Sequence, residues 1–418
     1  MYLKIAVIMQ SFLEVNMERV ISALGALVFI GISYAFSIQR DAVRWRTVAW
    51  GLGLEFIFAL VILKTPWGLK AFKSLGDAIS NFLAFSDVGA KFVFGDNFKD
   101  HFFAFQVLPT IIFFSAFISV LYHYGILQRL VQGLAWVMIK TMRTSGSESL
   151  SCAGNIFLGP TESALIVKPY IAKMTQSELH AVMTGGFATI AGGVLGAYLS
   201  FGIPAEHLIA AFFMTAPTSL VVSKLLYPET EVSETTGQAK MDVKTSYINV
   251  IDAATTGAID GVKLAVNVGV VIIAFLGLLA AVNALLGWLG SNVGLPQLSL
   301  EWILSFIMAP VAFLMGVPWA DCTQVGALLG KKTILNEFLA FLDLKQLIES
   351  GKISQRAVII ATYALCNFAN IGSIGIMIGG IAGIAPNRQK DLARMGFRAM
   401  IGGLLASFIT ACIAGILV

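Results

Sequence analysis

Charged side chains are scarce in this chain. Only 12% of its 418 residues are Asp, Glu, Lys or Arg, whereas soluble globular domains carry about 25%. Hydrophobic residues make up 57% of the sequence, and the mean hydropathy is +0.82. This composition excludes an ordinary soluble domain and predicts an all-α polytopic membrane protein.

Cysteine and histidine are rare, with four of each. They are scattered, without the close spacing that is typical of a zinc site, and the cysteines in apolar stretches are expected to be buried free thiols. The small net charge of +4 gives no indication of nucleic-acid binding. The first apolar run, near Val20, lacks a small-residue cleavage site, so we expect it to remain as a helix.

Eight stretches are apolar and long enough to cross a bilayer, which takes roughly 20 residues. The predicted transmembrane helices are 20–37, 47–64, 103–125, 178–202, 205–226, 262–289, 356–383 and 391–417. Two further stretches, 66–99 and 126–144, mix apolar with charged residues. This mixture predicts amphipathic helices that lie at the membrane interface.

Two other apolar segments are interrupted at their centres. Residues 159–162 (Gly-Pro-Thr-Glu) interrupt the segment 148–172, and residues 316–321 (Gly-Val-Pro-Trp-Ala-Asp) interrupt the segment 300–343. Proline breaks a helix and glycine permits a turn, and backbone freed at membrane depth must face protein or a water-filled cavity. We therefore expect two re-entrant hairpins whose tips stop near the midplane.

A matched pair of motifs follows the two hairpins. Residues 186–192 (Gly-Phe-Ala-Thr-Ile-Ala-Gly) and 367–373 (Asn-Phe-Ala-Asn-Ile-Gly-Ser) place glycine and polar side chains inside apolar spans. Matched interruptions in two halves of a membrane protein are a strong sequence indication of a secondary transporter's binding site. The order span, hairpin, broken span, span occurs twice with an odd number of crossings, which predicts an inverted repeat.

These boundaries divide the chain into four parts. We expect N-terminal spans and interfacial helices that form a scaffold over 1–102, and a first repeat over 103–227. A polar cytoplasmic loop is expected over 228–261, and the second repeat over 262–418.

Arginines predict the orientation of these parts. They lie between the first two spans, between 129 and 143, and between 388 and 394. Because cytoplasmic connections are enriched in basic residues, this pattern places both termini outside. One basic cluster then falls outside as an exception, formed by Lys331, Lys332, Lys345, Lys352 and Arg356.

Ionisable side chains within membrane segments are costly and are therefore candidates for function. Glu162 lies at the first predicted hairpin tip, and Glu337 lies in the returning arm of the second hairpin. We expect both to be functional. Glu55 lies in an uninterrupted span, where a hydrogen bond or a reach toward the lipid edge is expected. Asp321 is expected to cap a helix.

The polar residues of the broken segments suggest a ligand with hydroxyls and amide-like edges. Asn370 and Ser373 both donate and accept hydrogen bonds and share a helix face, and Phe368 offers an aromatic surface. The set contains no arginine, which argues against a phosphorylated or carboxylated substrate. Side-chain oxygens of Asn155 and Thr189 at helix breaks suit a small cation.

Four motifs together resemble the concentrative nucleoside transporter family. They are residues 154–163 (Gly-Asn-Ile-Phe-Leu-Gly-Pro-Thr-Glu-Ser), 183–192 (Met-Thr-Gly-Gly-Phe-Ala-Thr-Ile-Ala-Gly), 336–338 (Asn-Glu-Phe) and 368–373 (Phe-Ala-Asn-Ile-Gly-Ser). The resemblance implies a homotrimer in membrane lipid, in the bacterial inner membrane. It implies nucleoside import by symport with sodium, by alternating access, without enzymatic activity and without a cofactor.

The resemblance also implies roles for individual residues. Base contacts are implied for Gly159, Pro160, Thr161, Glu162 and Val194, and ribose contacts for Glu337, Phe368, Asn370 and Ser373. A sodium site is implied for Asn155 and Thr189 with the carbonyls of Leu158 and Ile190. Sodium-coupled members commonly have Gln where this chain has Pro160. Because Pro cannot donate a hydrogen bond, the preference for purine or pyrimidine stays open.

Other readings of the sequence have less support. A proton-coupled nucleoside symporter is the nearest alternative, although proton-coupled relatives tend to lack the asparagine at Asn155. An intramembrane enzyme would need a catalytic constellation, and the serines near the first hairpin have no histidine in that segment. A channel could use hairpins to line a pore, but two blocked hairpins with paired carboxylates fit a substrate site better.

Overall fold

The structure, a computed structural model, describes residues 2–100, 102–237 and 247–418. No β-strand occurs among these residues, and the α-helices are joined by short 3-10 and π turns. The helices of the first half are α1 (Tyr2–Ala35), α2 (Trp45–Lys64), α3 (Pro66–Leu83), α4 (Ser86–Phe94), α5 (Leu108–His123), α6 (Ile126–Met142), α7 (Gly146–Gly154), α8 (Pro160–Ile166), α9 (Lys168–Ile171), α10 (Gln176–Ala188), α11 (Gly192–Ser200) and α12 (Ala205–Leu226). Those of the second half are α13 (Val250–Asn292), α14 (Leu300–Leu314), α15 (Cys322–Ile334), α16 (Glu337–Glu349), α17 (Gln355–Leu365), α18 (Ile371–Ile384) and α19 (Gln389–Leu417).

Each predicted span has a helical counterpart. In the described part of the chain, 6 helices are long and apolar enough to cross a membrane, and they correspond to the part of α1 from Asn16 on and to α2, α5, α12, α13 and α19. The other two predicted spans, 178–202 and 356–383, are the helix pairs α10–α11 and α17–α18, each separated by a short non-helical break. The prediction of an all-α membrane fold is confirmed, and both breaks overlap the matched motifs.

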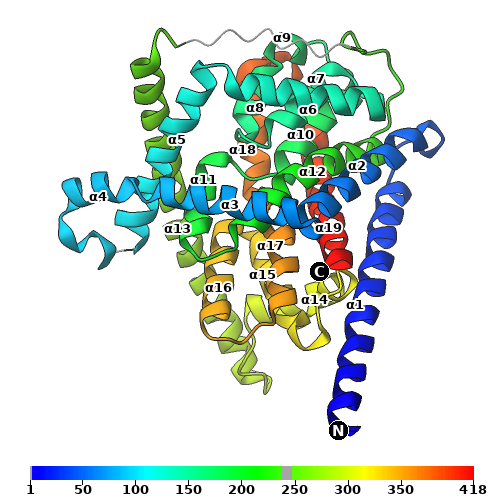
Figure 1. The fold of residues 1–418 in the computed structure, drawn as a ribbon, viewed down its shortest axis with the longest axis vertical. Helices are drawn as coiled ribbons and strands as arrows, with labels where there is room; N and C mark the ends of the chain where they lie inside the picture. The colour runs from blue at the N-terminus through cyan, green and yellow to red at the C-terminus, as the bar shows by residue number, and fades with distance from the viewer. Residues whose placement is uncertain (1, 101, 238–246) are drawn as a thin grey trace.

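The order of elements repeats along the chain. α5, α6, the pair α7–α8, the broken pair α10–α11 and α12 are followed by α13, α14, the pair α15–α16, the broken pair α17–α18 and α19. The amphipathic stretches predicted over 66–99 and 126–144 contain α3, α4 and α6. Figure 1 shows α3 crossing the face of the molecule, with α4 projecting beyond it.

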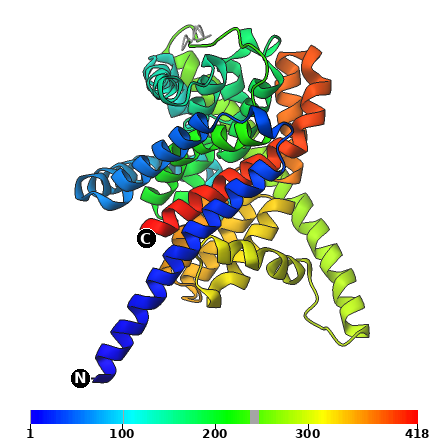
Figure 2. The same ribbon diagram turned by 90° about the vertical axis from the view of Figure 1, so that its right-hand side faces the viewer.

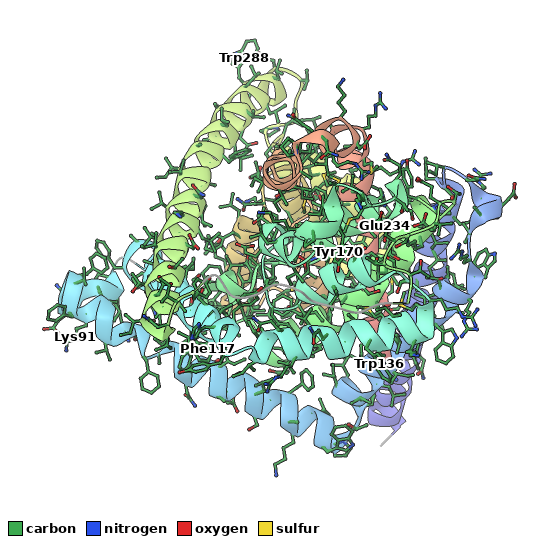
Figure 3. All side chains as sticks on the ribbon, turned by 90° about the horizontal axis from the view of Figure 1, so that it is seen from above. Lys91, Phe117, Trp136, Tyr170, Glu234 and Trp288 are labelled. Carbon is green, nitrogen blue, oxygen red and sulfur yellow. The ribbon has the colours of Figure 1, made fainter. Side chains whose placement is uncertain are left out.

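The helices divide into a dense core and an outlying pair. α1 runs along α19, and α2 packs on α12 (Figure 2), so the N-terminal helices join the ends of the two halves. By contrast, α13 packs along α5 at one edge of the molecule, with Trp288 at its outer end (Figure 3). In the most apolar stretch of α13 only 12% of the residues are buried, whereas in the corresponding stretch of α19 the share is 89%.

The polar loop after α12 is shorter than predicted. We expected it to extend over 228–261, but α13 begins at Val250, because the side chain of Asn249 caps the helix and accepts hydrogen bonds from the N–H groups of Ile251 and Asp252. Part of the loop, residues 238–246, lies outside the described residues.

The start of this loop is docked on the helix core. Gly146 at the start of α7 donates its N–H to the carbonyl of Thr235 over 2.9 Å, and Gln176 at the start of α10 donates its N–H to Glu231 over 3.2 Å. Beneath it, the buried Lys224 pairs with Glu148 at 2.6 Å. The first part of the loop therefore ties α7, α10 and α12 together.

The second hairpin differs from the prediction in the position of its tip. The predicted interruption at 316–321 exists, and Gly316 has a φ of +84° there, but this turn joins α14 to α15. A second interruption at Leu335 and Asn336 separates α15 from α16. Asn336 starts α16 by accepting a hydrogen bond from the N–H of Leu339 over 3.0 Å. The apex that carries Glu337 is therefore the turn at 335–336.

Asp321 does not cap a helix with its side chain, as we had expected. It occupies the N-cap position of α15, but its carboxylate makes no capping hydrogen bond there. Instead, it accepts hydrogen bonds from the N–H and the hydroxyl of Ser354 at the start of α17. The carboxylate thus connects two helices that are distant in sequence.

Three residues of the basic cluster that conflicts with the predicted orientation are paired or buried, namely Lys331, Lys332 and Arg356, whereas Lys352 is exposed. Lys331 Nζ lies 2.6 Å from Asp343 Oδ2, and Arg356 Nε lies 3.0 Å from Glu18 Oε2 on α1. Lys332 is fully buried. Lys331, Lys332 and Arg356 are therefore not free loop charges, so they are weaker evidence against the predicted orientation.

Candidate functional site

The two broken helices meet at their breaks. The N–H of Phe368, which follows the end of α17, donates to the carbonyl of Phe187 over 2.9 Å and to that of Thr189 over 3.1 Å. Both acceptors lie at the end of α10. Backbone groups freed by one break are thus satisfied by the other, which allows non-helical chain to exist inside an apolar protein.

Polar side chains hold the second break open. The Nδ2 of Asn367 donates to the carbonyl of Ala364 over 2.7 Å, and its Oδ1 accepts from the N–H of Ala369 over 3.1 Å. Asn370 caps α18, with its Oδ1 accepting from both the N–H and the hydroxyl of Ser373 at 2.9 Å. The amides of the motif therefore replace helical hydrogen bonds, which explains why this sequence interrupts a span.

The first apex, residues 155–162, packs against the first break. A Cβ atom on Gly192 would lie 2.3 Å from the carbonyl oxygen of Phe157, so only glycine permits this approach. On the other side, Pro160 packs against Gly186, where an added Cβ would lie 2.9 Å from the Pro160 ring and 2.4 Å from Met377 Cε. Pro160 is therefore enclosed by apolar groups from α10 and α18.

The polar end of the first apex is more open. Thr161 Oγ1 donates to Glu162 Oε2 over 3.2 Å, and Glu162 is exposed. Thr161 lies against α18, where a Cβ on Gly380 would meet its methyl carbon at 2.3 Å. Within the described residues, Glu162 makes no contact with the second predicted carboxylate, Glu337.

The second apex places a buried carboxylate beside the crossing of the breaks. Glu337 is 3% exposed in the first turn of α16. Its Oε1 accepts a hydrogen bond from the hydroxyl of Tyr198 on α11 over 3.2 Å, and Asn370 lies beside it. Val194, one turn before Tyr198 on the same helix, is also buried. The helices α11, α16 and α18 thus converge on the carboxylate of Glu337.

The predicted cation residues gather around the end of α10. Asn155 is fully buried, and its Oδ1 accepts from the hydroxyl of Ser163 over 2.8 Å, while its amide nitrogen has no partner among the described residues. A Cβ on Gly185 would lie 3.2 Å from that nitrogen, and the carbonyl of Gly185 accepts from Thr189 Oγ1 over 3.1 Å. Ile190 is buried and Leu158 partly buried. Amide, hydroxyl and carbonyl oxygens of this kind suit a hard cation.

Two residues of the site were not found from the sequence. Tyr198 donates a hydrogen bond to Glu337, and the buried Lys332 precedes the turn that carries Glu337, but each sits in a helix whose inner face depends on tertiary packing. A hydroxyl inside an apolar run is the one signal for Tyr198. Lys332 was assigned to an external cluster, although it is fully buried. Glu55 is also fully buried, beside Thr218 and Thr410, which excludes a reach toward the lipid edge.

Broken helices that cross in the middle of an all-helical membrane protein, flanked by two hairpin apices, are the architecture of secondary transporters. Sequence profiles described as "Na+ dependent nucleoside transporter C-terminus", "Na+ dependent nucleoside transporter N-terminus" and "Nucleoside recognition" match residues 207–415, 24–97 and 104–205. The chain belongs to the Na+-dependent nucleoside transporter family.

Curated relatives and solved structures agree with this assignment. The chain is 46% identical over 418 residues to "Solute carrier family 28 member 3" of Homo sapiens, covering 97% of this chain and 60% of that protein. It is 48% identical over 416 residues to "Sodium/nucleoside cotransporter 1" of Mus musculus, covering 96% of this chain and 64% of that protein. The chain thus spans about three fifths of the length of these curated relatives.

The structural similarity extends over almost the whole chain. CNTnw in an inward-facing substrate-bound state is 39% identical, with a TM-score of 0.90 and coverage of 95% of this chain and 97% of CNTnw. A CNTnw variant in an outward-facing state is 38% identical, also with a TM-score of 0.90, and covers 96% of this chain and 98% of that one.

Proposed function

We propose that this chain imports nucleosides by symport with sodium, through alternating access and with the substrate bound near the bilayer midplane. The observation that carries the proposal is the crossing of the two breaks, where Phe368 is hydrogen-bonded to the end of α10 and Glu337 and Asn370 lie side by side. Sodium/nucleoside cotransporters among the relatives, and the inward- and outward-facing states of CNTnw, support it.

The second apex is proposed to bind the ribose. The Glu337 carboxylate accepts hydrogen bonds from substrate hydroxyls, and Asn370 and Ser373 add groups that donate and accept. Phe368 is partly buried at the crossing and supplies an apolar face for the sugar or the base. The absence of arginine from this set fits a neutral substrate.

The first apex is proposed to bind the base. It supplies Gly159, Pro160, Thr161 and Glu162, with Val194 from α11 on the opposite side. The enclosure of the Pro160 ring by Gly186 and Met377 leaves Thr161 and Glu162 as the polar side chains among these base-binding residues. Base recognition therefore depends on these two residues and on bridging water.

Sodium is proposed to bind at the end of α10, to Asn155 and Thr189 and to the carbonyls of Leu158 and Ile190. These residues join the first apex to the first break, and the base-binding residues follow directly in the chain. An ion bound here orders the apex, which raises the affinity for nucleoside, and by linkage the nucleoside raises the affinity for sodium.

The moving unit is proposed to be larger than the sequence suggested. α1 and α2 pack on α12 and α19, so they belong with the core that carries the two apices. The outlying pair α5–α13 is the better candidate for a fixed scaffold. Its exposed apolar face on α13 suits both lipid and the contacts of a homotrimer. We place the protein in a bacterial inner membrane with both termini outside.

The test is uptake of labelled uridine and adenosine into liposomes that contain the purified protein, with and without an inward sodium gradient at fixed pH. Saturable uptake stimulated by sodium is the expected result, and the Pro160→Gln variant is expected to change the ratio of uridine to adenosine uptake. Uptake driven by a proton gradient alone would support the proposed substrate but contradict sodium as the coupling ion. No uptake of either nucleoside would overturn the function.

A further inference from the structure

Lys332 is a fully buried lysine that the proposed transport mechanism does not use. It lies in the last turn of α15, with a relative exposure of 0%. Its Nζ has no hydrogen-bond partner among the described residues. An unpaired ammonium buried away from water is costly, so a lysine at such a position is expected to interact with a nearby opposite charge.

The carboxylate of the second apex follows Lys332 closely in the chain. Glu337 lies on the far side of the turn at Leu335 and Asn336, in the first turn of α16. One carboxylate oxygen accepts from Tyr198, whereas the other, Oε2, has no partner among the described residues. Lys332 and Glu337 are thus two buried side chains of opposite charge type on either side of one turn, each with a polar atom that lacks a hydrogen-bond partner among the described residues.

The ends of the two helices favour both charges. The C-terminal end of a helix carries partial negative charge and stabilises a cation, and the N-terminal end stabilises an anion. Lys332 lies in the last turn of α15, and Glu337 lies in the first turn of α16. The turn at 335–336 therefore presents a cation and an anion in the places that their helix dipoles prefer.

We propose that Lys332 is a positioning residue of the nucleoside site: it is the internal counter-charge that keeps Glu337 an ionised acceptor aimed at the substrate. This inference rests on the proposed function, because Glu337 is the ribose contact there. An ionised acceptor makes hydrogen bonds roughly twice as strong as a neutral one. In this proposal Lys332 does not contact the nucleoside and acts entirely through Glu337.

The neighbouring lysine provides a matched control. Lys331 Nζ lies 2.6 Å from Asp343 Oδ2 and 3.7 Å from Glu301 Oε1, so its charge is used at the periphery of the same helix. Lys331→Met removes one positive charge from the same turn of α15 without touching Glu337. A general effect of charge or of α15 stability would therefore appear in both lysine variants.

The experiment is a double-mutant cycle on the purified full chain in detergent. Lys332→Met, Glu337→Gln and the double variant are compared with the parent by thermal unfolding, which needs no substrate, and by uridine binding. We expect the double variant to unfold at a higher temperature than Glu337→Gln alone, because it leaves no unpaired ammonium. We expect Lys332→Met to bind uridine about tenfold more weakly or worse, and Lys332→Arg to recover part of the affinity.

In uptake, Lys332→Met is expected to raise KM more than it lowers the maximal rate, while Lys331→Met keeps the KM of the parent within about twofold. Additive thermal shifts in the cycle, or unchanged uridine affinity in Lys332→Met, would overturn the proposal. A parent protein that binds no nucleoside would instead contradict the proposed function, and the thermal cycle would still decide whether the pair exists.

Discussion

The two apices of the site are built in opposite ways. The first ends in an exposed carboxylate, Glu162, which accepts a hydrogen bond from the adjacent Thr161 over 3.2 Å. The second buries its carboxylate, Glu337, against Tyr198 from another helix. A buried acceptor fixed by distant elements is preorganised, whereas an exposed one with a local partner is free to rearrange. The second apex therefore suits an invariant sugar, and the first suits a variable base.

The largest effect should come from breaking the preorganised apex. Glu337→Gln is expected to reduce sodium-driven uridine uptake about 100-fold or more, because it removes a buried ionised acceptor and leaves its surroundings unpaired. Uptake into liposomes measures this, with retention of a folded protein checked by size-exclusion chromatography. Glu349→Gln on the same helix is the control, since that side chain is 64% exposed. Glu337→Gln uptake within threefold of the parent would refute the role of this carboxylate.

The next largest effect should come from pushing the first apex away from the break. Gly192→Ala places a Cβ 2.3 Å from the carbonyl oxygen of Phe157. We expect a loss of stability of about 1–3 kcal/mol, as for other overpacked sites, and a fall in uptake of about tenfold. Gly375→Ala on α18 is the control, because nothing lies within 4 Å of its added Cβ. Equal behaviour of the two variants would show that the contact does not constrain the apex.

A smaller and more selective effect is expected at the cation residues of the first apex. Asn155→Ala removes the amide that lies against Gly185, so the sodium concentration for half-maximal uptake should rise about fivefold, with uptake largely restored at saturating sodium. Ser163→Ala removes only the hydroxyl that holds this amide and should shift the sodium response less in the same direction. A sodium response that stays unchanged in Asn155→Ala would place the ion elsewhere.

The smallest effect is expected at the exposed carboxylate. Glu162→Gln should raise the KM for uridine about threefold to fivefold, because water can replace a hydrogen bond at an accessible position. The effect should differ between uridine and adenosine, whereas that of Glu337→Gln should not. Equal losses of uridine uptake in the Glu162→Gln and Glu337→Gln variants would contradict the distinction between an adaptable first apex and a preorganised second apex.

Local sequence signals predicted the spans, both breaks and, to within a few residues, the first apex: the interruption was expected at 159–162, whereas α7 ends at Gly154 and α8 begins at Pro160. Apolar runs of sufficient length identify helices, and Pro160 directly after Gly159 marks the start of α8. The second apex was misplaced because Gly316 and Pro318 form a stronger local signal than Asn336, where the helix is interrupted by a Leu335 with φ −99° and ψ −91°. No residue type marks that backbone conformation, so only tertiary structure reveals which interruption carries the site.

The partners of the buried charged residues also could not be predicted from the sequence. Lys332 and Lys331 are adjacent and chemically identical, yet Lys332 is fully buried without a hydrogen-bond partner among the described residues and Lys331 pairs with Asp343. The burial of Lys332 depends on how α15 packs against helices far away in the chain. Tyr198 likewise meets Glu337 across 139 positions. Helix periodicity gives the faces of one helix, but not which face a distant helix will cover.

The contacts of α1 set an order for assembly during synthesis. The hydroxyl of Ser22 donates to the carbonyl of Met315, 293 positions later, and accepts from Arg356, 334 positions later. α1 also packs along α19, near the other end of the chain. A nascent chain that emerges from its N-terminal side therefore carries α1 in the bilayer without its partners until most of the protein has been made. α1 therefore reaches its final neighbours late, and substitutions at Ser22 are expected to accumulate a nearly complete protein with α1 undocked.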